Sequence, residues 1–366
     1  MENLRIAIVL PNFNGGGAER AALTLASHRS NTVVVAEAGA GPLREAAWAC
    51  EILIVSTTRP VRNRLARIVR LSKALDFVEP SLVVSALSPV VVVAAAKLSG
   101  VPSCLWLQSP IRPERSDVRW LLAGLRVSAR LTDAIAATSP GLLEEYRALG
   151  APSHKLTVLP NCIPPPGPPP VTEGPKRDVF RIAMVGRLAP EKRHDLLFSA
   201  IAALRTRTDR AIAADILGVG PEYGSLLEMA RELGIADNLS FVGFVDDPSP
   251  YIKRSDVLVV SSDYEGFGNV LIEALACGVP VISTDVPFGP RYILNGGEFG
   301  TLVPAGDAAA IADALLDLLA AGPLSPPERL RLARRASHFS ADSVAERLTA
   351  IAEAVVSSGP LPPTRF

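Results

Sequence analysis

The sequence predicts an α/β fold of two Rossmann-like domains, each built on a doubly wound parallel sheet. Short β-branched runs alternate with helical patterns along the whole chain, and this alternation starts afresh after a proline-rich stretch near the middle. With 366 residues, of which 48% are hydrophobic, the chain is long and apolar enough to fill two separate cores.

The N-terminal half carries seven candidate strands, each a short run rich in small or β-branched residues. They are Arg5–Leu10, Thr32–Glu37, Ile52–Ser56, Leu82–Ala86, Ser103–Gln108, Ala134–Thr138 and Thr157–Leu159. Helical patterns separate most of them, as at Ala18–His28, Arg62–Val78 and Gly141–Leu149. We therefore expect residues 1–163 to form the first domain.

Residues 164–175 form the expected linker. Six prolines and one glycine fill positions 164–170. Because proline lacks an amide hydrogen and has a fixed φ, this stretch can be neither a helix nor an interior strand. The sequence therefore predicts a stiff connection between two domains.

The C-terminal half repeats the alternation over residues 176–340. Its candidate strands are Phe180–Val185, Ala214–Gly218, Ser240–Val242, Val257–Ser261 and Val279–Ser283. Since ligands bind beyond the carboxyl ends of strands in such sheets, we expect a site in a cleft between facing domains. The last segment, 341–366, opens with the amphipathic pattern Ala341–Val356, an expected helix that crosses back to the N-terminal domain.

Charge divides the chain although its net charge is zero. Residues 1–160 hold 18 Lys and Arg against 12 Asp and Glu, whereas the remainder holds 19 against 25. A basic N-terminal half indicates an anionic partner, such as a phosphorylated acceptor or an anionic membrane surface; the alternative is that arginines only solvate helix faces. The balanced total and the lack of a basic–aromatic surface motif argue against nucleic-acid binding.

The sequence also favours a cytoplasmic protein, with peripheral contact at the inner face of the cytoplasmic membrane as a further expectation. No apolar run is long enough to span a bilayer, and the first strand pattern begins too early for a signal peptide. The cysteines lack metal-ligand spacing, so we expect them to be reduced and mostly packed: Cys50, Cys104, Cys162 and Cys277.

The segment Gly186–Lys192 is the first candidate for ligand binding, because it directly follows a strand pattern. A glycine at a strand end lets a ligand approach the backbone, and Arg187 and Lys192 place two cations in the same loop. Arginine binds phosphate in a bidentate manner and lysine supplies a compact charge. The loop is a candidate diphosphate site; the alternative is an ordinary strand-to-helix loop with solvated charges.

The segment Glu265–Glu273 follows another strand pattern and forms the second candidate. Its two glycines precede a helix, whose free amides and positive dipole end favour an anion. Glu273 can accept hydrogen bonds from both hydroxyls of a ribose, as acidic residues do in other nucleotide-binding folds. The alternative is a solvated helix position, which its small apolar neighbours disfavour.

Two further glycine-containing turns follow strand patterns. Ser283–Arg291 offers hydroxyls, a turn and a guanidinium, and Gly15–Arg20 opens a helix after the first strand. One glycine turn is weak evidence for an anion site, but four at strand ends in two domains are strong evidence.

With these segments, the chain resembles the family-four (group 1) retaining glycosyltransferases over nearly its whole length. The resemblance is carried by Gly15–Arg20, Gly186–Lys192, Leu217–Glu222, Phe241–Val245, Glu265–Glu273 and Gly289–Arg291. It implies the GT-B fold, with an acceptor-binding domain at 1–163 and a nucleotide-sugar domain at 176–340. Within the family, the chain is most similar to enzymes that extend polyprenyl-diphosphate-linked glycans.

The resemblance also implies a role for each site residue. Arg187 and Lys192 would neutralise the leaving nucleoside diphosphate, work that a metal does in other transferases, so neither metal nor cofactor is expected. Glu265 would contact the donor sugar and complete the catalytic set, and Glu273 would bind the ribose. The other expected donor contacts are Gly16, Gly17, Gly186, Gly243, Phe244, Gly266, Phe267, Gly268, Asn269 and Val270. The expected acceptor or accessory residues are Glu19, Arg20, Gln108 and Arg291.

Two positions depart from the family pattern. Many relatives carry a histidine after the strand Ser103–Leu107, where this chain has Gln108, which can make the same hydrogen bond but cannot carry a proton at neutral pH. Tyr292 stands where relatives often place a glutamate. Both departures bear on donor and acceptor choice more than on reaction class.

We therefore expect a hexosyltransferase-type enzyme. It would move a sugar from a UDP-sugar to a hydroxyl of a lipid-linked or polysaccharide acceptor, with the retention of configuration that the family implies. Two alternatives stay open: a sugar-nucleotide epimerase of the same architecture, and a non-catalytic nucleotide-sugar-binding subunit, which the missing histidine motivates.

The helical pattern at 62–78 is basic and amphipathic. Its cations are Arg62, Arg64, Arg67, Arg70 and Lys73, and its apolar residues include Leu65, Ile68, Val69, Leu71 and Leu75. Such a pattern is typical of a helix that docks on an anionic membrane. Its hydrophobic side serves equally well as a face for the domain core.

Overall fold

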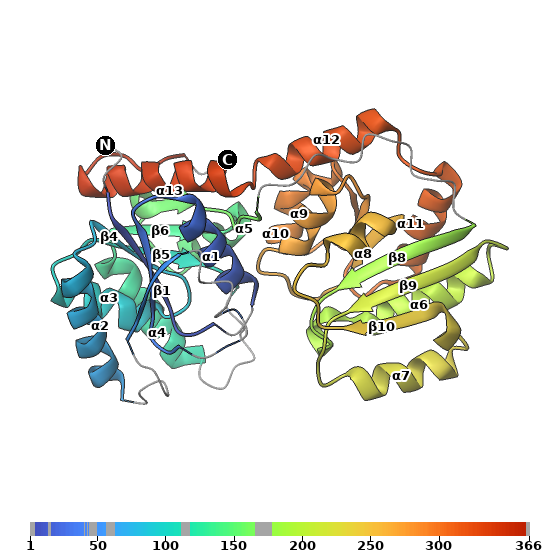
Figure 1. The fold of residues 1–366 in the computed structure, drawn as a ribbon, viewed down its shortest axis with the longest axis horizontal. Helices are drawn as coiled ribbons and strands as arrows, with labels where there is room; N and C mark the ends of the chain where they lie inside the picture. Colours follow the sequence, from blue (N-terminus) through green and yellow to red (C-terminus); the bar gives the residue numbers. More distant parts are fainter. Residues whose placement is uncertain are drawn as a thin grey trace. The chain divides into compact units, whose positions relative to one another are not determined.

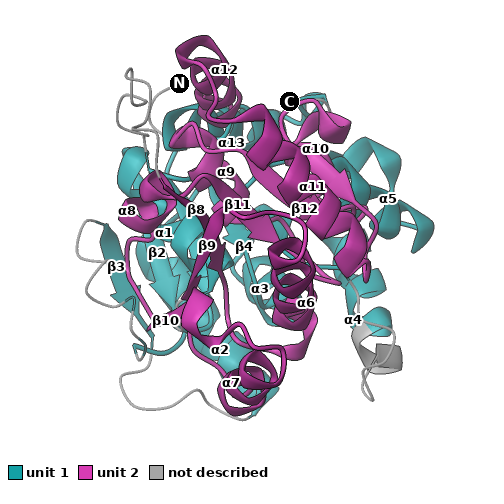
Figure 2. Cartoon of the chain, turned by 90° about the vertical axis from the view of Figure 1, so that its right-hand side faces the viewer, with its two compact units in different colours: residues 1–165, 339–366 teal, residues 166–338 magenta. Residues whose placement is uncertain are grey.

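The computed structural model describes residues 4–13, 16–39, 41, 43, 50–55, 63–110, 118–164 and 178–363, without the side chains of 118–121. It divides into two compact units, shown in separate colours in Figure 2. Unit 1 comprises residues 1–165 and 339–366, and unit 2 comprises residues 166–338. Apart from Pro164, the expected linker at 164–175 lies outside the described residues.

Unit 1 contains a parallel seven-stranded sheet in the order β3-β2-β1-β4-β5-β6-β7. The strands are β1 Ile6–Leu10, β2 Thr32–Ala36, β3 Glu51–Ile54, β4 Leu82–Ser85, β5 Ser103–Leu107, β6 Ala134–Ala137 and β7 Leu156–Val158. Most are buried on both faces, which is why their sequences are apolar runs without strict alternation. All seven confirm the strands expected from the sequence.

Helices cover both faces of this sheet. They are α1 Gly17–His28, α2 Arg64–Val78, α3 Pro89–Leu98, α4 Val118–Leu131, α5 Pro140–Ala148 and α13 Ala341–Val356. One core cluster joins the sheet to α1 and α13, and another joins its opposite face to α2 and α3. The side chain of Asn63 caps α2 by accepting hydrogen bonds from two backbone amides, which starts the helix at Arg64.

The C-terminal helix α13 completes unit 1 (Figure 1). Its residues Leu348 and Ile351 are fully buried in the core shared with α1. The guanidinium of Arg29 donates to the hydroxyl of Thr349 at 3.0 Å, and the backbone amide of Ile163 donates to a carbonyl at residue 339 at 3.1 Å. These contacts explain why the return to unit 1 begins at residue 339 rather than at 341.

Unit 2 contains a parallel six-stranded sheet in the order β10-β9-β8-β11-β12-β13. The strands are β8 Val179–Val185, β9 Ala211–Leu217, β10 Leu239–Gly243, β11 Val257–Val260, β12 Val281–Thr284 and β13 Thr301–Val303. The first five confirm expected strands. The sequence did not predict β13, because three residues at a partly exposed sheet edge give no periodic pattern.

The helices of unit 2 are α6 His194–Arg205, α7 Tyr223–Glu232, α8 Ser249–Arg254, α9 Asn269–Ala276, α10 Gly289–Ile293, α11 Ala308–Ala321 and α12 Pro326–Ser337. Helices α6 and α11 pack together over the core of this sheet. Helix α9 packs against α12. Unit 2 thus has a hydrophobic core of its own.

The strand order reverses between β8 and β11, which are neighbours in the sheet of unit 2. Ligands of doubly wound sheets bind beyond the carboxyl ends of the strands at such a reversal. The candidate segments Gly186–Lys192 and Glu265–Glu273 follow these two strands. The topology therefore places both segments at one edge of the sheet.

The cysteines and helices agree with the compositional expectations. Cys104, Cys162 and Cys277 are buried free thiols, and Cys50 is a half-buried one. Within the described parts of the chain, each helix is too short or too polar to cross a lipid bilayer.

Candidate functional site

The loop after β8 turns sharply through a short 3-10 helix, η4 (Pro190–Lys192). Arg193 follows with a φ of 50°, in the left-handed region that is strained for a residue with a side chain. Its guanidinium pairs with Asp195 at 2.9 Å and with Asp263 at 3.1 Å. These ion pairs stabilise the turn and join the loop after β8 to the loop after β11.

Lys192 and Glu265 form an ion pair in which Nζ and Oε1 are 2.5 Å apart. Only 23% of the lysine side chain and 11% of the glutamate side chain are exposed. The hydroxyl of Ser262 donates a hydrogen bond to the same carboxylate oxygen at 2.9 Å. The structure thus brings together two of the three expected catalytic residues.

Buried hydroxyl groups fix this ion pair to the sheet. Ser261 Oγ donates to the carbonyl oxygens of Lys192 and Arg193 at 3.0 and 2.8 Å. Thr284 Oγ1, at the end of β12, donates to the carbonyl oxygen of Ser262 at 2.6 Å. All three hydroxyl-bearing residues are fully buried. Because these bonds join the ends of β8, β11 and β12, the Lys192 loop is held by the sheet edge.

Arg187, the third expected catalytic residue, has a different partner. Its guanidinium pairs with Glu191, and 65% of its side chain is exposed. Arg291, an expected accessory residue, likewise pairs with Asp285. Arg187 and Lys192, the two cations expected near the diphosphate, therefore each contact a carboxylate already. An incoming phosphate must either displace that carboxylate or bind alongside it.

Glycines allow the loops after β8 and β9 to run in direct contact. A Cβ atom at Gly218 would lie 1.9 Å from the carbonyl oxygen of Gly186, and one at Gly220 would lie 2.1 Å from that of Leu188. The amide of Gly186 also donates to the carbonyl of Leu217 at 2.9 Å. A side chain at either position would push the two loops apart, so glycine is required there.

The turn before α9 is packed equally closely. Gly268 precedes the helix with a φ of 93°, in the left-handed region. A Cβ atom at Gly289 would lie 1.7 Å from the carbonyl oxygen of Phe267, so the start of α10 rests on this turn. Phe267, an expected donor contact, is only 3% exposed, so this residue is packed within unit 2.

Glu273 is the fifth residue of α9 and is half-buried. It therefore lies in the second turn of the helix whose start carries the other expected donor contacts. Those contacts are also half-buried: Gly266, Gly268, Asn269 and Val270. This exposure suits groups that stay accessible to a ligand while held by the fold.

Apolar surface borders the ends of β9 and β10. Phe244 is 52% exposed and directly follows Gly243, whose φ of 84° turns the chain after β10. The ring of Tyr223 is 50% exposed and lies 5.3 Å from the ring of Phe241. Gly243 and Phe244 were expected as donor contacts from the sequence, whereas Tyr223 was not singled out.

His194 begins α6 beside Lys192 and is 2% exposed. Neither ring nitrogen has a hydrogen-bond partner in the described part of the chain. Burial, assisted by the charge of Lys192, lowers the pKa of His194 to about 4, so the ring is neutral at pH 7. Sequence reasoning missed this residue and the serines 261 and 262, because isolated small polar residues give no periodic signal.

Four expected residues of unit 1 lie at the start of α1, namely Gly16, Gly17, Glu19 and Arg20, while Gly15 lies outside the described residues. Glu19 is 8% exposed, and a Cβ atom at Gly16 would lie only 2.5 Å from its carboxylate oxygen Oε2. A negative charge thus already lies at the positive end of the helix, beside Gly16 and Gly17. Arg20 is half-buried on the same helical turn.

Gln108 follows β5 of unit 1. Both polar atoms of its side-chain amide are buried without a hydrogen-bond partner among the described residues. An unpaired buried amide is unfavourable, so this position suits a polar group of a ligand. The observation favours the accessory role expected for Gln108.

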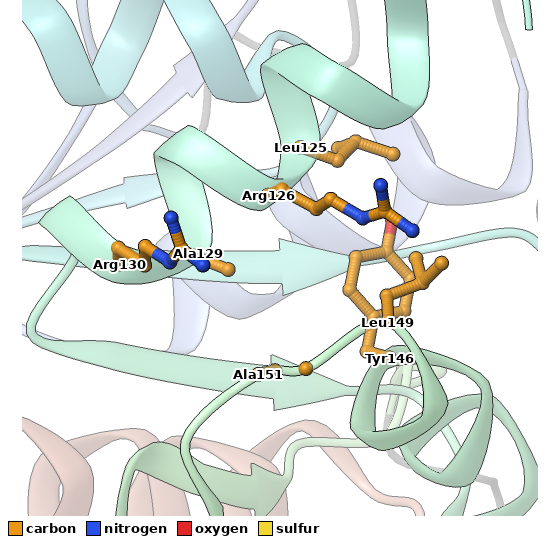
Figure 3. A pocket seen from close by; sticks show the side chains of 8 residues that line it. Leu125, Arg126, Ala129, Arg130, Tyr146, Leu149 and Ala151 are labelled. Carbon is orange, nitrogen blue, oxygen red and sulfur yellow. The ribbon is translucent and has the colours of Figure 1, made fainter. Parts of the chain in front are cut away.

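A small pocket of unit 1 lies between α4 and α5 (Figure 3). Arg126, Arg130 and Tyr146 help to line it near the carboxyl ends of these two helices. Those helix ends lead into the amino ends of β6 and β7. The pocket therefore lies at the sheet edge opposite to the one where parallel sheets bind ligands.

Two family models match the chain. The model described as glycosyl transferases group 1 matches residues 172–338, and the one described as glycosyltransferase family 4 matches residues 15–166. These matches cover most of unit 2 and most of the N-terminal part of unit 1. The segments Gly186–Lys192 and Glu265–Glu273 both lie within the first match.

Similar proteins include glycosyltransferases of bacterial glycan synthesis. The lipopolysaccharide core biosynthesis glycosyltransferase LpsE of Rhizobium meliloti is 33% identical over 210 residues, which are 56% of this chain and 58% of that protein. The N-acetylgalactosamine-N,N'-diacetylbacillosaminyl-diphospho-undecaprenol 4-alpha-N-acetylgalactosaminyltransferase of Campylobacter jejuni is 34% identical over 169 residues, 46% of this chain and 45% of that protein. The chain therefore spans about half the length of these relatives.

The crystal structure of Anabaena Alr3699/HepE in complex with UDP has the same fold. It matches with a TM-score of 0.79 at 19% identity and covers 97% of this chain and 100% of that one. This likeness confirms the expected GT-B fold.

Proposed function

The chain belongs to the group 1 glycosyl transferases, and on that premise we propose that it transfers a sugar from a nucleotide-sugar to a hydroxyl of a glycan acceptor. The observation that carries the proposal is the buried Lys192–Glu265 pair at the shared edge of β8 and β11. The donor is a UDP-sugar and the acceptor a lipid-linked or polysaccharide glycan. The UDP complex of HepE and the names of the two bacterial relatives support these assignments.

In the proposed reaction, the bond between the anomeric carbon and the diphosphate oxygen breaks. The oxygen of the acceptor hydroxyl bonds to the same carbon, and its proton passes to the departing phosphate oxygen. UDP and the extended glycan are the products. The configuration is retained because the acceptor attacks from the face that the leaving group vacates.

Lys192 supplies positive charge where the leaving diphosphate develops negative charge. Its ion pair with Glu265 and the bonds from Ser261 to the backbone fix its position before the donor arrives. A charge that is already in place stabilises the transition state without reorganisation. Arg187 turns from Glu191 to the diphosphate, and Glu265 accepts hydrogen bonds from hydroxyls of the donor sugar.

The test follows UDP release from labelled UDP-sugars in the presence of lipid-linked glycans. Lys192→Ala should lower kcat by about a hundredfold, the order of effect seen when one such transition-state contact is removed. Lys97→Ala is the matched control, because it removes a lysine of unit 1 that is ion-paired with Asp133. Addition of EDTA should leave turnover unchanged, since the proposal assigns no step to a metal.

The proposal fails if the protein neither binds nor turns over any of the labelled nucleotide-sugars tested. A changed sugar still attached to UDP, formed without acceptor, would instead identify an epimerase. Binding of UDP-sugars without any turnover, together with intact cellular function in Lys192→Ala and Glu265→Ala, would identify a binding subunit.

A further inference from the structure

Arg193 lies directly after Lys192 and has a strained backbone. Its φ of 50° and ψ of 48° are left-handed, a conformation in which a Cβ atom crowds the following carbonyl oxygen. Within the described part of the chain, five residues other than glycine have positive φ, and two of them are asparagines, which tolerate this region. Strain of this kind persists only where surrounding contacts hold it, and it is frequent at functional sites.

The guanidinium of Arg193 connects two segments of unit 2. Its Nε and Nη2 atoms donate to the carboxylate of Asp195, in the first turn of α6, at distances of 2.9 to 3.3 Å. Its Nη1 atom donates to both carboxylate oxygens of Asp263, each at 3.1 Å, in the loop after β11. These three side chains form what we call the Arg193 bridge, which joins the start of a helix to the loop that carries Glu265.

Hydrogen bonds to the backbone connect the same two segments. The amide of Asp263 donates to the carbonyl oxygen of Glu191 at 3.0 Å. The hydroxyl of Ser261 donates to the carbonyl oxygen of Arg193 itself at 2.8 Å, which holds the strained residue from its other side. The turn at Arg193 is therefore held through both its side chain and its backbone.

The Lys192–Glu265 ion pair also connects these two segments. Helix α6, which follows Arg193, is fixed in the core of unit 2, because Leu197 and Phe198 are fully buried there. Without the Arg193 bridge, residue 193 would relax toward an ordinary φ, and the Lys192 side of the turn would take up the change. The direction of the Lys192 side chain therefore depends on the bridge.

We propose that Arg193 is a positioning residue for the sugar transfer: its bridge to Asp195 and Asp263 holds Lys192 where the leaving diphosphate develops charge. The inference rests on the proposed function, because it assigns Arg193 an effect only through Lys192. A cation stabilises a transition state best when its position is fixed beforehand, and a shift of about 1 Å is costly. Arg193 makes no contact with the donor in this proposal.

Stability alone does not account for an arginine at this position. The side chains of Arg193, Asp195 and Asp263 are 30%, 42% and 40% exposed, and ion pairs with this much exposure contribute little to stability. A glycine would adopt the left-handed conformation without strain. The contacts of Arg193 therefore explain a fixed geometry beside Lys192 better than they explain a more stable fold.

The experiment compares Arg193→Gly and Asp263→Asn with the parent protein in the release of UDP from UDP-sugars. Each variant should lower kcat by about tenfold or more, because displacement of a catalytic group by about 1 Å can cost about a hundredfold. The KM for the UDP-sugar should change by less than about threefold, since the affected contact acts in the transition state. The midpoint of thermal unfolding of Arg193→Gly should stay within about 4 °C of that of the parent.

Combination with Lys192→Ala separates positioning from direct contact. If Arg193 acts through Lys192, Arg193→Gly should cause no further decrease in kcat once residue 192 is alanine, because the two changes remove one interaction. A further decrease of about tenfold in the double variant would show that Arg193 acts on the substrate or on the fold instead. Either result would overturn the proposal.

The matched control is Glu79→Gly, because Glu79 has the same φ of 50° at the end of α2 in unit 1. It relieves the same kind of strain and should leave kcat unchanged. Hydrogen exchange without ligand should be faster in residues 190–196 and 261–265 of Arg193→Gly and Asp263→Asn, but not of the control. Unchanged exchange in those residues, or unchanged kcat, would overturn the positioning role. A parent protein without turnover would instead contradict the proposed function, and hydrogen exchange would still show whether the Arg193 bridge holds the turn.

Discussion

The charged residues of the donor loops are paired with one another. Lys192 contacts Glu265, and Arg187 contacts Glu191, although both cations are expected to hold a diphosphate. Such pairs prevent isolated positive charges from lying side by side, but they also compete with the ligand. If these loops bind the donor as proposed, we expect the diphosphate to take over Arg187 from its carboxylate partner.

Replacing Glu191 by Gln should tighten UDP binding. The change keeps the shape of the side chain and removes the charge that competes for Arg187. The gain should be about threefold, because exposed ion pairs of this kind are weak. Isothermal titration with UDP measures it, with Glu232→Gln on the exposed side of α7 as the control. Unchanged or weaker affinity would contradict the exchange.

His194 should make stability depend on pH. Its pKa is about 4 when folded, against an ordinary value of 6.5, so the unfolded chain takes up the proton first as the pH falls. The stabilisation is complete above pH 6.5 and is lost progressively toward pH 4, by up to about 3 kcal/mol.

His194→Leu should flatten this pH dependence. The ring nitrogens have no described hydrogen-bond partner, so an apolar side chain of similar volume should be tolerated at pH 7. Denaturant unfolding of both proteins at pH 7 and at pH 5 gives the comparison. If the parent and the variant lose equal stability on acidification, His194 is not the titrating group.

At the scale of elements, loops in close contact shape the site. Gly289 allows α10 to rest against the turn before α9, and a side chain there has no room. By contrast, a Cβ atom at Gly224 in α7 would meet nothing within 4 Å. Both glycines lie at the start of a helix, but only Gly224 leaves space for a side chain.

Gly289→Ala should cost about 1–3 kcal/mol, because the new Cβ atom overlaps a backbone carbonyl, and it should weaken UDP binding by displacing the turn. Gly224→Ala should be neutral or stabilise by up to about 1 kcal/mol, since alanine favours the helix. Thermal unfolding and titration with UDP report both effects. Equal behaviour of the two variants would count against close packing at the site.

The sequence predicted most elements of the fold and singled out the glycine-marked loops that the structure brings to one sheet edge. The strands are local apolar runs, and the loops are marked by glycines at their ends, so both signals lie within a few residues. The short edge strand β13 was missed because it depends on pairing with β12 rather than on its own pattern. The role of Ser261 was missed for a similar reason, because its hydrogen bonds reach residues 68 and 69 positions away.

At the scale of the whole molecule, the two units have separate cores. Leu348 of α13 is fully buried in unit 1, and Leu315 of α11 is fully buried in unit 2. Each core contains only residues of its own unit. A loss of packing in one core should therefore destabilise mainly the unit that contains it.

Leu348→Ala and Leu315→Ala should each cost about 3 kcal/mol, the usual order for a buried leucine. Hydrogen exchange read by mass spectrometry should show faster exchange in residues 1–165 and 339–366 for the first variant, and in residues 166–338 for the second. Addition of UDP should slow hydrogen exchange in unit 2 of both variants. Faster exchange throughout the chain in either variant would indicate one cooperative unit.

The order of residues along the chain was sufficient to determine the two-sheet architecture, because hydrophobic periodicity and the special geometry of glycine and proline act locally. Only the folded chain decided which acid each cation contacts and which side of α2 faces water. Glu265 lies 73 positions beyond Lys192, and a contact across that distance depends on how β8 and β11 pair. Side chains with the same local sequence pattern can therefore lie in the core, form an ion pair or face the solvent.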